Sequence, residues 1–523
     1  MRGFAVCLGV GVSVVCMPPV RAAVTISSAA TSNMSCSNGV CAPTETDAVL
    51  NVDDLETLLA SGNIKVTTTG SVVQAKDINV TTALTWNDGS TLALDAHHEI
   101  AIAATISVAG SGGMSLVSGS GAQISYEGGN IAFANLESSL TINKKTFLLV
   151  ADIKTLSNDV ASQPHGNFAL ANNYDASADG TYASDPVETP FDGIFEGLGN
   201  AISNLSISDG TDNEAGLFET ISSGGILRDV GVVNASISSV PEFAGVLVGL
   251  NKGKIIRCYS SGTVNGGAEA YAGGLIGSNE GLVIQSSTSA VVSSEWAGGL
   301  VGSNNGTIHA GYATGAVTGT DLAGGLVAAN EGGVIYYSQA SGTILLNDTA
   351  EGSAGGLAGI DFGLIAQSFA TGSVTGGSNV VAGGLAGEEV GTLEDSYATG
   401  DVGASNISSV GGLVGCVNGC ESSTGGEVLT SYSTGRVARS AGGFTGGFVG
   451  TDNTFGGITN SYWDTTTSGR RKGTGNRGNE PGITGRTTTQ LQSKLPYGFS
   501  KKVWAENPGI NGGLPYLIAN PPN

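Results

Sequence analysis

The sequence predicts an all-β fold, a right-handed parallel β-helix (solenoid) with about one coil per 25–31-residue repeat and short capping helices. Glycine accounts for 84 of the 523 residues, whereas an average protein contains about 7% glycine. The hydrophobic share is 40%, too high for a disordered chain, and the aromatic share of 6% is low for one large core. These values favour many short strands joined by tight turns.

An internal repeat is the strongest of the observations. A motif of small residues around one apolar residue recurs at intervals of 28, 25, 26, 31, 28, 28 and 35 residues. Its central residues are Leu247, Leu275, Leu300, Leu326, Leu357, Leu385, Leu413 and Phe448. A period in this range is typical of a solenoid, whereas propeller blades need about 40–45 residues. The glycine and valine content disfavours helical repeats.

Spacing within the repeat predicts where each coil turns. A glycine follows each of the first seven centres after six residues, and in five repeats an Asn or Asp stands two residues before it. Because these residues tolerate a positive φ, we expect a tight turn there. Only the segment from a later valine to the next centre varies in length, between 8 and 13 residues. We therefore expect three short strands, two tight corners and one variable corner per coil.

Two columns of like residues support stacking of the coils. An aromatic residue recurs at Tyr259, Tyr312, Phe369, Tyr397, Tyr432 and Tyr462, and mostly small residues precede it at Cys258, Gly311, Ser368, Ser396, Ser431 and Ser461. Like residues on successive coils stack in parallel sheets. We therefore expect a packing role for Cys258. Sequence alternation leaves open whether the aromatic column faces inward or outward.

The chain divides into five segments. Residues 1–23 have the features of a secretory signal peptide, with Arg2, an apolar stretch and small residues around the cleavage point. About 13 apolar residues are too few for a membrane-spanning helix, which needs about 20, and we expect no such helix elsewhere. The other segments are an N-terminal cap and β-helical region (24–145), a junction (146–210), the repeat β-helix (211–462) and a C-terminal closing segment (463–523).

Short capping helices are predicted near both ends. Asp53 and Glu56 form a capping-box pattern, and Gly62 ends the helix that follows. We expect this amphipathic helix to cover the open end of the β-helix, where unpaired strand edges would invite aggregation. Residues 487–494 predict a similar helix at the other end.

The mature chain has two close pairs of cysteines. Cys36 lies near Cys41, and Cys416 lies near Cys420. Each pair could close a small disulfide in an oxidising compartment, and the sequence leaves open whether either one forms.

Metal and cofactor motifs are incomplete. Asp175 and Asp179 match the first half of a calcium loop, but its twelfth position is proline where a bidentate Glu is needed. The run His97-His98-Glu99 lacks the spacing of a zinc helix, and we expect a solvated strand. No glycine-rich segment ends in the Gly-Lys-Ser/Thr of a phosphate-binding loop. We expect neither a bound metal nor a cofactor.

The variable corners are the candidate recognition surface. Two of them carry aromatic residues, Tyr271 and Trp296, beside Glu269 and Glu295. Aromatic side chains in surface loops can anchor glycans or proteins, although they can equally be packed in the structure. The acidic residues form no recurring pair of the kind that glycoside hydrolysis needs, so the sequence predicts no enzyme.

Several segments resemble a known bacterial repeat. Ala297-Gly298-Gly299-Leu300-Val301-Gly302, followed by Asn305-Gly306-Thr307-Ile308, is similar to the GLUG repeat of filamentous haemagglutinin-like exoproteins. Residues 191–200 resemble the lead-in to such arrays, and residues 461–464 and 512–517 resemble their closing segment. The resemblance implies an exported, adhesin-like protein of a Gram-negative-type cell surface. It also implies a host protein or glycan as partner and a separate outer-membrane secretion partner.

Charge narrows the range of partners. The formal net charge is −23, so the chain should repel nucleic acids and anionic membrane surfaces. Two other functions stay open besides adhesion: a β-helical enzyme that degrades polysaccharide and a purely structural surface spacer. A cluster of carboxylates in a groove would favour the enzyme.

Overall fold

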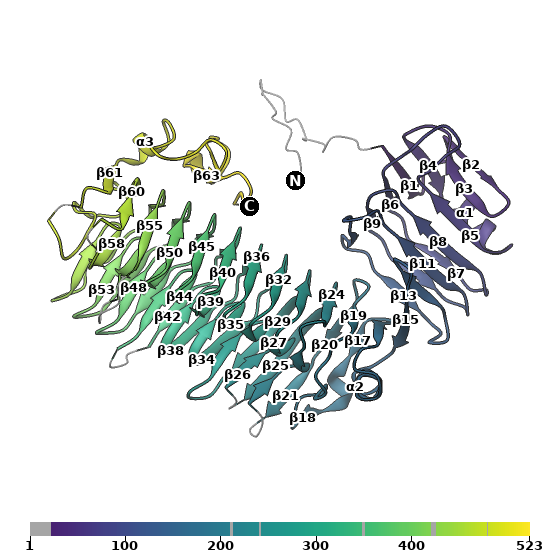
Figure 1. Cartoon of the computed structure of the whole chain (residues 1–523), viewed down its shortest axis with the longest axis horizontal. Helices are drawn as coiled ribbons and strands as arrows, with labels where there is room; N and C mark the ends of the chain where they lie inside the picture. Colours follow the sequence, from purple (N-terminus) through teal and green to yellow (C-terminus); the bar gives the residue numbers. More distant parts are fainter. Residues whose placement is uncertain are drawn as a thin grey trace. The chain divides into compact units, whose positions relative to one another are not determined.

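The computed structural model describes residues 22–209, 213–239, 242–347, 351–419, 425–454, 456–478 and 480–522. Its fold is a β-solenoid with parallel sheets, as the sequence predicted, and 47% of the residues are in strands. Two compact units share the chain (Figure 1): one contains residues up to Ala151 with Asn167–Asn173 and Phe195–Asn200, and the other contains Asp152–Gly166, Tyr174–Ile194 and Ala201–Asn523. The predicted signal peptide lies outside the described residues except for Ala22 and Ala23.

Three sheets form the first unit. One is ordered β12 (Ile124–Tyr126), β9 (Ile100–Ile102), β6 (Asp77–Val80), β1 (Ala23–Ser27) and β4 (Ala48–Asn51), and the second is β13 (Ile131–Phe133), β10 (Ile106–Val108) and β7 (Leu84–Trp86). The third contains β2 (Met34–Ser37), β3 (Val40–Pro43), β5 (Ile64–Thr67), β8 (Thr91–Asp95), β11 (Gly113–Val117), β14 (Leu140–Ile142), β15 (Lys145–Val150) and β16 (Asn167–Leu170). Buried isoleucines stack in register between coils, as Ile78, Ile100 and Ile124 do.

The first helix confirms the predicted cap and corrects its mechanism. Helix α1 (Val52–Leu59) starts at an N-cap of Asn51, whose side chain accepts hydrogen bonds from backbone N–H groups of the first turn. The predicted capping box is therefore wrong. Glu56 instead accepts a hydrogen bond of 2.8 Å from the backbone N–H of Thr85, which lies on the edge strand β7. The helix thus satisfies an otherwise unpaired strand edge.

Coils of the second unit contain more strands than the sequence predicted. One coil consists of β30 (Tyr271–Gly273), β31 (Ile276–Asn279), β32 (Leu282–Ile284) and β33 (Ser287–Thr288), and β34 (Val291–Gly298) leads into the next. The variable segment therefore contains a strand of its own, and Tyr271 pairs in register with Trp296 of the following coil. The prediction of three strands and a loop-like variable corner is wrong for this reason.

Three parallel stacks run through the second unit (Figure 1). The first contains β23 (Phe218–Ile221), β27 (Val248–Asn251), β31, β35 (Val301–Asn304), β39 (Val327–Asn330), β44 (Ala358–Asp361), β49 (Ala386–Glu389), β54 (Val414–Val417) and β58 (Val449–Asp452). The second contains β24 (Ile226–Arg228), β28 (Lys254–Ile256), β32, β36 (Thr307–His309), β40 (Val334–Tyr336), β45 (Leu364–Ala366), β50 (Thr392–Glu394), β55 (Glu427–Leu429) and β59 (Ile458–Thr459).

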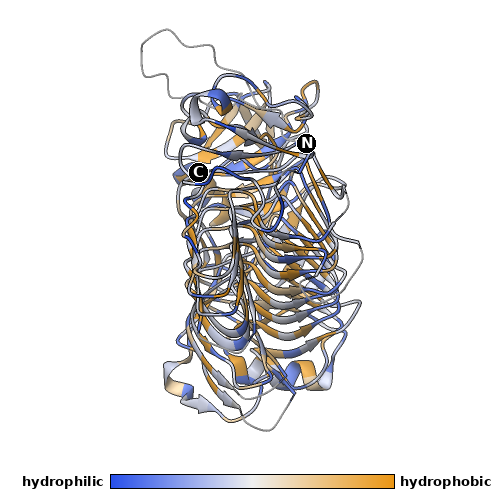
Figure 2. Cartoon of the chain, turned by 90° about the vertical axis from the view of Figure 1, so that its left-hand side faces the viewer, coloured by the Kyte–Doolittle hydropathy of each residue, from blue (hydrophilic) through white to orange (hydrophobic). Residues whose placement is uncertain are grey.

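The third stack holds the remaining strands of each coil. Strands upstream of the repeat centre include β26 (Phe243–Gly245), β30, β34, β38 (Val317–Gly324), β43 (Ser353–Gly355), β48 (Val381–Gly383), β53 (Ser409–Gly411) and β57 (Phe444–Gly446). Strands at the position of the aromatic column include β29 (Tyr259–Asn265), β33, β37 (Tyr312–Ala313), β41 (Gln339–Ala340), β46 (Phe369–Ala370), β51 (Tyr397–Ala398), β56 (Tyr432–Ser433) and β60 (Ser461–Asp464), of which β33 and β41 have Ser287 and Gln339 there. Apolar segments repeat along the stacked strands in Figure 2.

The predicted Asn-x-Gly turns are present, but of the seven predicted turn glycines only Gly332 and Gly419 have the expected positive φ. Asn251, Asn279 and Asn304 point into the coil and are fully buried. Each donates its side-chain amide to the next side chain of the ladder over 2.7 Å. The glycine is needed because a Cβ at Gly281 would lie 2.2 Å from the carbonyl oxygen of Gly253 one coil earlier. The turn is therefore set by the ladder and by close backbone approach.

A left-handed residue instead makes the next corner of each coil. Its positions, none of them glycine, are Asp229, Arg257, Gln285, Ala310, Tyr337, Gln367, Asp395, Thr430 and Asn460, with φ between 45° and 56°. The residue type varies from coil to coil, so no sequence column marked this corner. At one step, the Arg257 guanidinium forms two hydrogen bonds of 2.6 Å with the Asp229 carboxylate below it.

The column of small residues faces inward. Successive serines are joined through the side-chain hydroxyl of one coil and the backbone N–H of another, as between Ser368 and Ser396. Cys258 occupies this column and is buried, and its backbone N–H donates a hydrogen bond of 3.2 Å to the Ser286 hydroxyl oxygen. Burial raises the pKa of the Cys258 thiol to about 12. The predicted packing role agrees with this environment.

The aromatic column faces outward and is covered over its later part. Phe369, Tyr397, Tyr432 and Tyr462 are buried in one cluster with Leu491, Phe499, Trp504 and Leu517 of the C-terminal segment. That segment contains β61 (Ile483–Arg486), α3 (Thr488–Leu491) and the antiparallel pair β62 (Trp504–Ala505) and β63 (Tyr516–Leu517). The predicted second helix is α3, which starts at a capping box of Thr487 and Gln490.

One helix was missed in the sequence. Helix α2 (Ile153–Ser162) belongs to the second unit. Asp152 caps it, and Ile153, Leu156 and Val160 are its buried residues. This is a helical spacing that the sequence contained. Within the described residues, we find no helix long and apolar enough to cross a membrane.

Candidate functional site

An open groove runs beside the upstream strands of the second unit. Its first wall is part of a column of residues in register on successive coils, and Leu322, Ser353, Val381, Ser409 and Phe444 of this column line its hollow. The residues of the whole column are Phe243, Tyr271, Trp296, Leu322, Ser353, Val381, Ser409 and Phe444. We call this set the groove column. Glycine follows two residues later because the chain bends sharply there, and a Cβ at Gly298 would lie 1.9 Å from the carbonyl oxygen of Val301.

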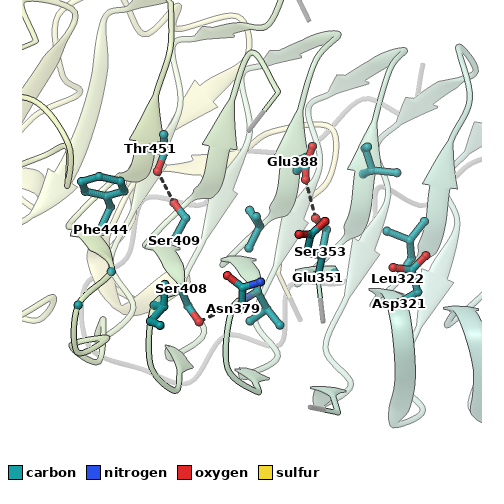
Figure 3. Close-up of a pocket in the computed structure, with 17 residues that line it drawn as sticks. Asp321, Leu322, Glu351, Ser353, Asn379, Glu388, Ser408, Ser409, Phe444 and Thr451 are labelled. Carbon is teal, nitrogen blue, oxygen red and sulfur yellow. Dashed lines mark hydrogen bonds between the residues drawn. The ribbon is translucent and has the colours of Figure 1, made fainter. Parts of the chain in front are cut away.

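The second wall comes from the strand after the bend. Its in-register residues include Ala329, Ile360, Glu388, Cys416 and Thr451. Two hydrogen bonds join the walls (Figure 3). The Ser353 hydroxyl donates to Glu388 Oε1 over 2.9 Å, and the hydroxyls of Ser409 and Thr451 are 2.7 Å apart. Each bond joins a coil to the one that follows, so the groove depends on the stacking register.

The hollow part of the groove has a volume of about 470 Å³. Apolar side chains in its lining include Leu322, Ile360, Val381, Ile407 and Phe444. Phe444 is 51% exposed and Ile407 is 67% exposed, which is unusual for side chains of this size. A hollow of this volume is within the range of about 300–1,000 Å³ for ligand sites.

Carboxylates supply the polar side of the groove. Asp321, Glu351 and Glu388 line it together, and among the described lining residues there is no lysine, arginine or histidine. Asp321 accepts a hydrogen bond of 2.7 Å from the indole N–H of Trp296. The site can therefore accept hydrogen bonds from hydroxyl or cationic groups and pack against apolar faces.

The two predicted binding residues lie on strands and not in loops. Tyr271 and Trp296 are partly buried neighbours in the groove column, and their ring centroids are 4.5 Å apart. Phe243 stacks on the other side of Tyr271 at 6.0 Å. The rings therefore pack on one another, and they also form one end of the groove column. The sequence left open whether these two aromatic residues bind a ligand or pack in the structure. In this arrangement they pack on one another and remain partly exposed.

The two weak candidates for metal ligands, Asp175 and Asp179, accept hydrogen bonds from neighbouring residues of the chain. Asp175 accepts the backbone N–H of Ser177 and the side-chain amide of Asn204, and these hydrogen bonds lower its pKa, the amide of Asn204 most. Asp179 accepts the hydroxyls of two tyrosines over 2.6 and 2.7 Å. Both side chains thus make hydrogen bonds within a polar loop.

The cysteine candidates differ in their outcome. Cys36 and Cys41 face each other on β2 and β3 and form a disulfide. Cys416 is buried and disulfide-bonded, and its predicted partner Cys420 lies outside the described residues.

The sequence did not identify Ser353, Glu388 or Phe444 as site residues. Each belongs to a different coil, and the corresponding positions in other coils carry unrelated residue types. No spacing in the sequence indicated that Glu351 would share a groove with Glu388. An alignment of successive repeats, centred on the residue before each Ala-Gly, Val-Gly or Thr-Gly pair, would have shown the column.

Comparison with known proteins gives limited matches. No known protein-family profile matches the chain. A segment is 36% identical over 128 residues to halomucin of Haloquadratum walsbyi, which covers 22% of this chain and 1% of halomucin. The chain therefore corresponds to a very small part of that relative.

Two solved structures give weak structural matches to the chain. One is a candidate immunoglobulin A1 protease from Bacteroides ovatus, at 17% identity and a TM-score of 0.31, covering 72% of this chain and 93% of the other. The second is named IgA1 protease, at 17% identity and a TM-score of 0.34, covering 71% of this chain and 28% of the other. At this similarity neither structure assigns an activity, substrate or partner to the chain.

These neighbours correct one prediction. The sequence predicted that the chain is not an enzyme, whereas both structures are named as proteases. A solenoid fold does not exclude catalysis, because function depends on a site and not on the fold. The prediction of a non-enzymatic protein is therefore withdrawn.

Proposed function

We propose that the second unit binds a neutral glycan along the groove column. The observation that carries this proposal is the combination of exposed Phe444 and Ile407 with Asp321, Glu351 and Glu388 in one hollow of about 470 Å³. Sugar rings present apolar C–H faces and polar hydroxyl edges. An apolar wall beside hydrogen-bond acceptors matches both features.

Charge supports a neutral ligand over an acidic one. The described lining residues carry carboxylates and no basic side chain, and the whole chain has a formal net charge of −23. An acidic polysaccharide would meet like charges along the groove, which disfavours association. A neutral chain avoids this cost and can donate its hydroxyl hydrogens to the carboxylates.

The repeat suits an extended ligand. Coils follow one another at about 4.8 Å, and the groove column presents one residue per coil from Phe243 to Phe444. A polymer laid along the coils would therefore contact one side chain of the groove column per coil, although the residue type changes from coil to coil. Small ligands would gain less, because they contact only one or two coils.

A glycan array with the purified chain tests this function. Phe444→Ala should lower binding of the selected neutral glycan at least tenfold. The matched control is Phe362→Ala, because Phe362 is similarly exposed at 44% and does not line the hollow. Equal binding by wild type and Phe444→Ala would contradict the proposal, and so would a preference for acidic glycans.

A second candidate function is cleavage of the bound glycan. Three carboxylates line the groove, and glycoside hydrolysis commonly uses two carboxylates on opposite sides of the scissile bond. Release of reducing ends from a bound neutral polysaccharide, lost in both Glu351→Gln and Glu388→Gln, would support this candidate. Binding without product after prolonged incubation would contradict it.

We further propose that the chain is exported and acts at a cell surface as an adhesin-like protein. The signal-peptide pattern in residues 1–23 and the resemblance to GLUG repeats support this proposal. A host glycan or glycoprotein would then be the groove ligand, and a separate outer-membrane partner would assist secretion. Protease accessibility of the chain on intact cells of the source bacterium tests the location, since a surface protein is cleaved while a cytoplasmic marker stays intact.

A further inference from the structure

A second cluster of polar side chains lies in the first unit. The imidazole of His98 lies 2.7 Å from Asp77, measured from Nδ1 to Oδ1. Glu99 completes the cluster, and one donor atom from each of the three residues lies within 4.8 Å of the others. The run 97–99 is a bend between β8 and β9 and not the solvated strand predicted from the sequence.

The stacking register brings two carboxylates together. Ile78 of β6 pairs with Ile100 of β9, which places Asp77 and Glu99 at the same position on adjacent coils. Like charges directly opposite each other on neighbouring strands destabilise a sheet. Asp77 is also buried, which makes an uncompensated charge more costly. A positive group between the two carboxylates removes this cost.

Neighbouring groups hold the side chains in place. The backbone N–H of Glu99 donates to Asp77 Oδ1 over 3.0 Å. Glu99 Oε1 accepts hydrogen bonds from the Gln123 amide at 3.2 Å and the Ser125 hydroxyl at 3.1 Å, both from the next coil. The side chain of His98 is 47% exposed, so the cluster is open to solvent on one side. Such supporting hydrogen bonds are typical of the groups around a metal site.

We propose that Asp77, His98 and Glu99 bind a divalent transition-metal ion, of which Zn²⁺ fits best. Zinc accepts both imidazole nitrogen and carboxylate oxygen as ligands, so all three side chains supply ligand atoms that suit it. The imidazole favours zinc over calcium or magnesium, which prefer oxygen ligands alone. The ion would take the place of the hydrogen between His98 and Asp77 and would neutralise the stacked carboxylates. Solvent access at His98 leaves room for water as a fourth ligand.

Titration of the full, untagged chain with Zn²⁺ in a calorimeter tests the site. We expect one equivalent to bind to the wild type, and His98→Ala and Glu99→Gln to weaken that binding at least tenfold. His97→Ala is the matched control, because His97 is adjacent and outside the cluster; it should bind like the wild type. Loss of binding in the control, or unchanged binding in both site variants, would overturn the assignment.

Co²⁺ provides a readout that does not depend on affinity alone. The cobalt-loaded wild type should show visible absorption bands from mixed nitrogen and oxygen ligation, and His98→Ala should change these bands. Far-ultraviolet circular dichroism shows whether each variant is folded. No binding of either ion to a folded wild type would also overturn the proposal.

Discussion

Two outward-facing aromatic columns in the same unit have different surroundings. In one, Tyr397 and Tyr432 stack with ring centroids 5.0 Å apart and are buried beneath the C-terminal segment. In the other, Tyr271 and Trp296 stack at 4.5 Å and remain partly exposed in the groove column. The coils produce both columns by the same in-register stacking.

The difference teaches that stacking alone does not indicate function. The covered column is a packing surface, because the chain supplies its own partner. Trp504 donates to Asp395 over 2.9 Å, and the Tyr432 hydroxyl donates to the Pro515 carbonyl over 2.6 Å. The groove column has carboxylates beside it instead. Substitutions in the two columns should therefore affect different properties.

The largest expected effect on stability comes from the C-terminal segment that covers the aromatic column. Trp504→Ala should lower the free energy of unfolding by about 3–5 kcal/mol, because it removes a fully buried aromatic side chain. Chemical denaturation followed by circular dichroism measures this loss. Tyr497→Ala, at an 82% exposed residue of the same segment, is the control and should change stability little. A loss below about 1 kcal/mol for Trp504→Ala would show that the segment is not anchored as described.

The enclosed polar ladder should make stability depend on pH. Asp361 continues the asparagine ladder, accepting the Asn330 amide over 2.6 Å, and is in register with Glu389. Both are fully buried. Burial, and then the Asp361 charge, raise the pKa of Glu389 well above its ordinary value of 4.5. The protonated form of Glu389 is therefore favoured, and this form can donate a hydrogen bond where the ionised form cannot.

The sign of the pH dependence follows from this raised pKa. The contribution of protonated Glu389 to the stability of the fold is complete below pH 4.5. It is lost as the pH rises through the pKa of Glu389 in the folded state. Glu389→Gln supplies a donor that does not titrate, so it should raise the free energy of unfolding at pH 8 by about 1–3 kcal/mol. Denaturation curves at several pH values measure this. Glu388→Gln is the neighbouring control. An unchanged pH dependence of stability in Glu389→Gln would contradict the assignment of this dependence to Glu389.

A smaller stability effect is expected in the groove column. Trp296→Ala removes the stacking on Tyr271 and the hydrogen bond to Asp321, at a partly exposed site. The free energy of unfolding should fall by about 1–2 kcal/mol. The same denaturation assay applies, with Trp504→Ala as the reference. A loss equal to that of Trp504→Ala would mean that the groove column is mainly structural, which would remove the contrast between the columns.

The smallest effect is expected at Cys258. Since the thiol is buried and its pKa is raised to about 12, it should not react with thiol reagents in the native state. Cys258→Ser matches the serines of the same inward column and should change stability by less than about 0.5 kcal/mol. Mass spectrometry after labelling measures the reactivity. Rapid modification of the native thiol would show that this column opens to solvent.

The sequence predicted the coil and its stacking, because glycine spacing and repeated apolar centres depend on short-range constraints. It did not predict which residues face each other across the bend. Ser353 and Glu388 meet only because one coil lies on the next, and Asp77 meets Glu99 for the same reason. The left-handed corner was missed because residues as different as Arg257 and Thr430 occupy it. The cover over the tyrosines could not be predicted, since Trp504 and Asp395 are joined by tertiary folding alone.

Tryptophan fluorescence offers the most direct test of the open groove column. Of the four tryptophans, Trp86, Trp463 and Trp504 are buried, so Trp296 should dominate quenching by acrylamide. Adding the neutral glycan selected on the array should protect Trp296 from the quencher, with the same concentration dependence as binding. A glycan that binds with full affinity and leaves the quenching of Trp296 unchanged would contradict the assignment of the groove column as the ligand site.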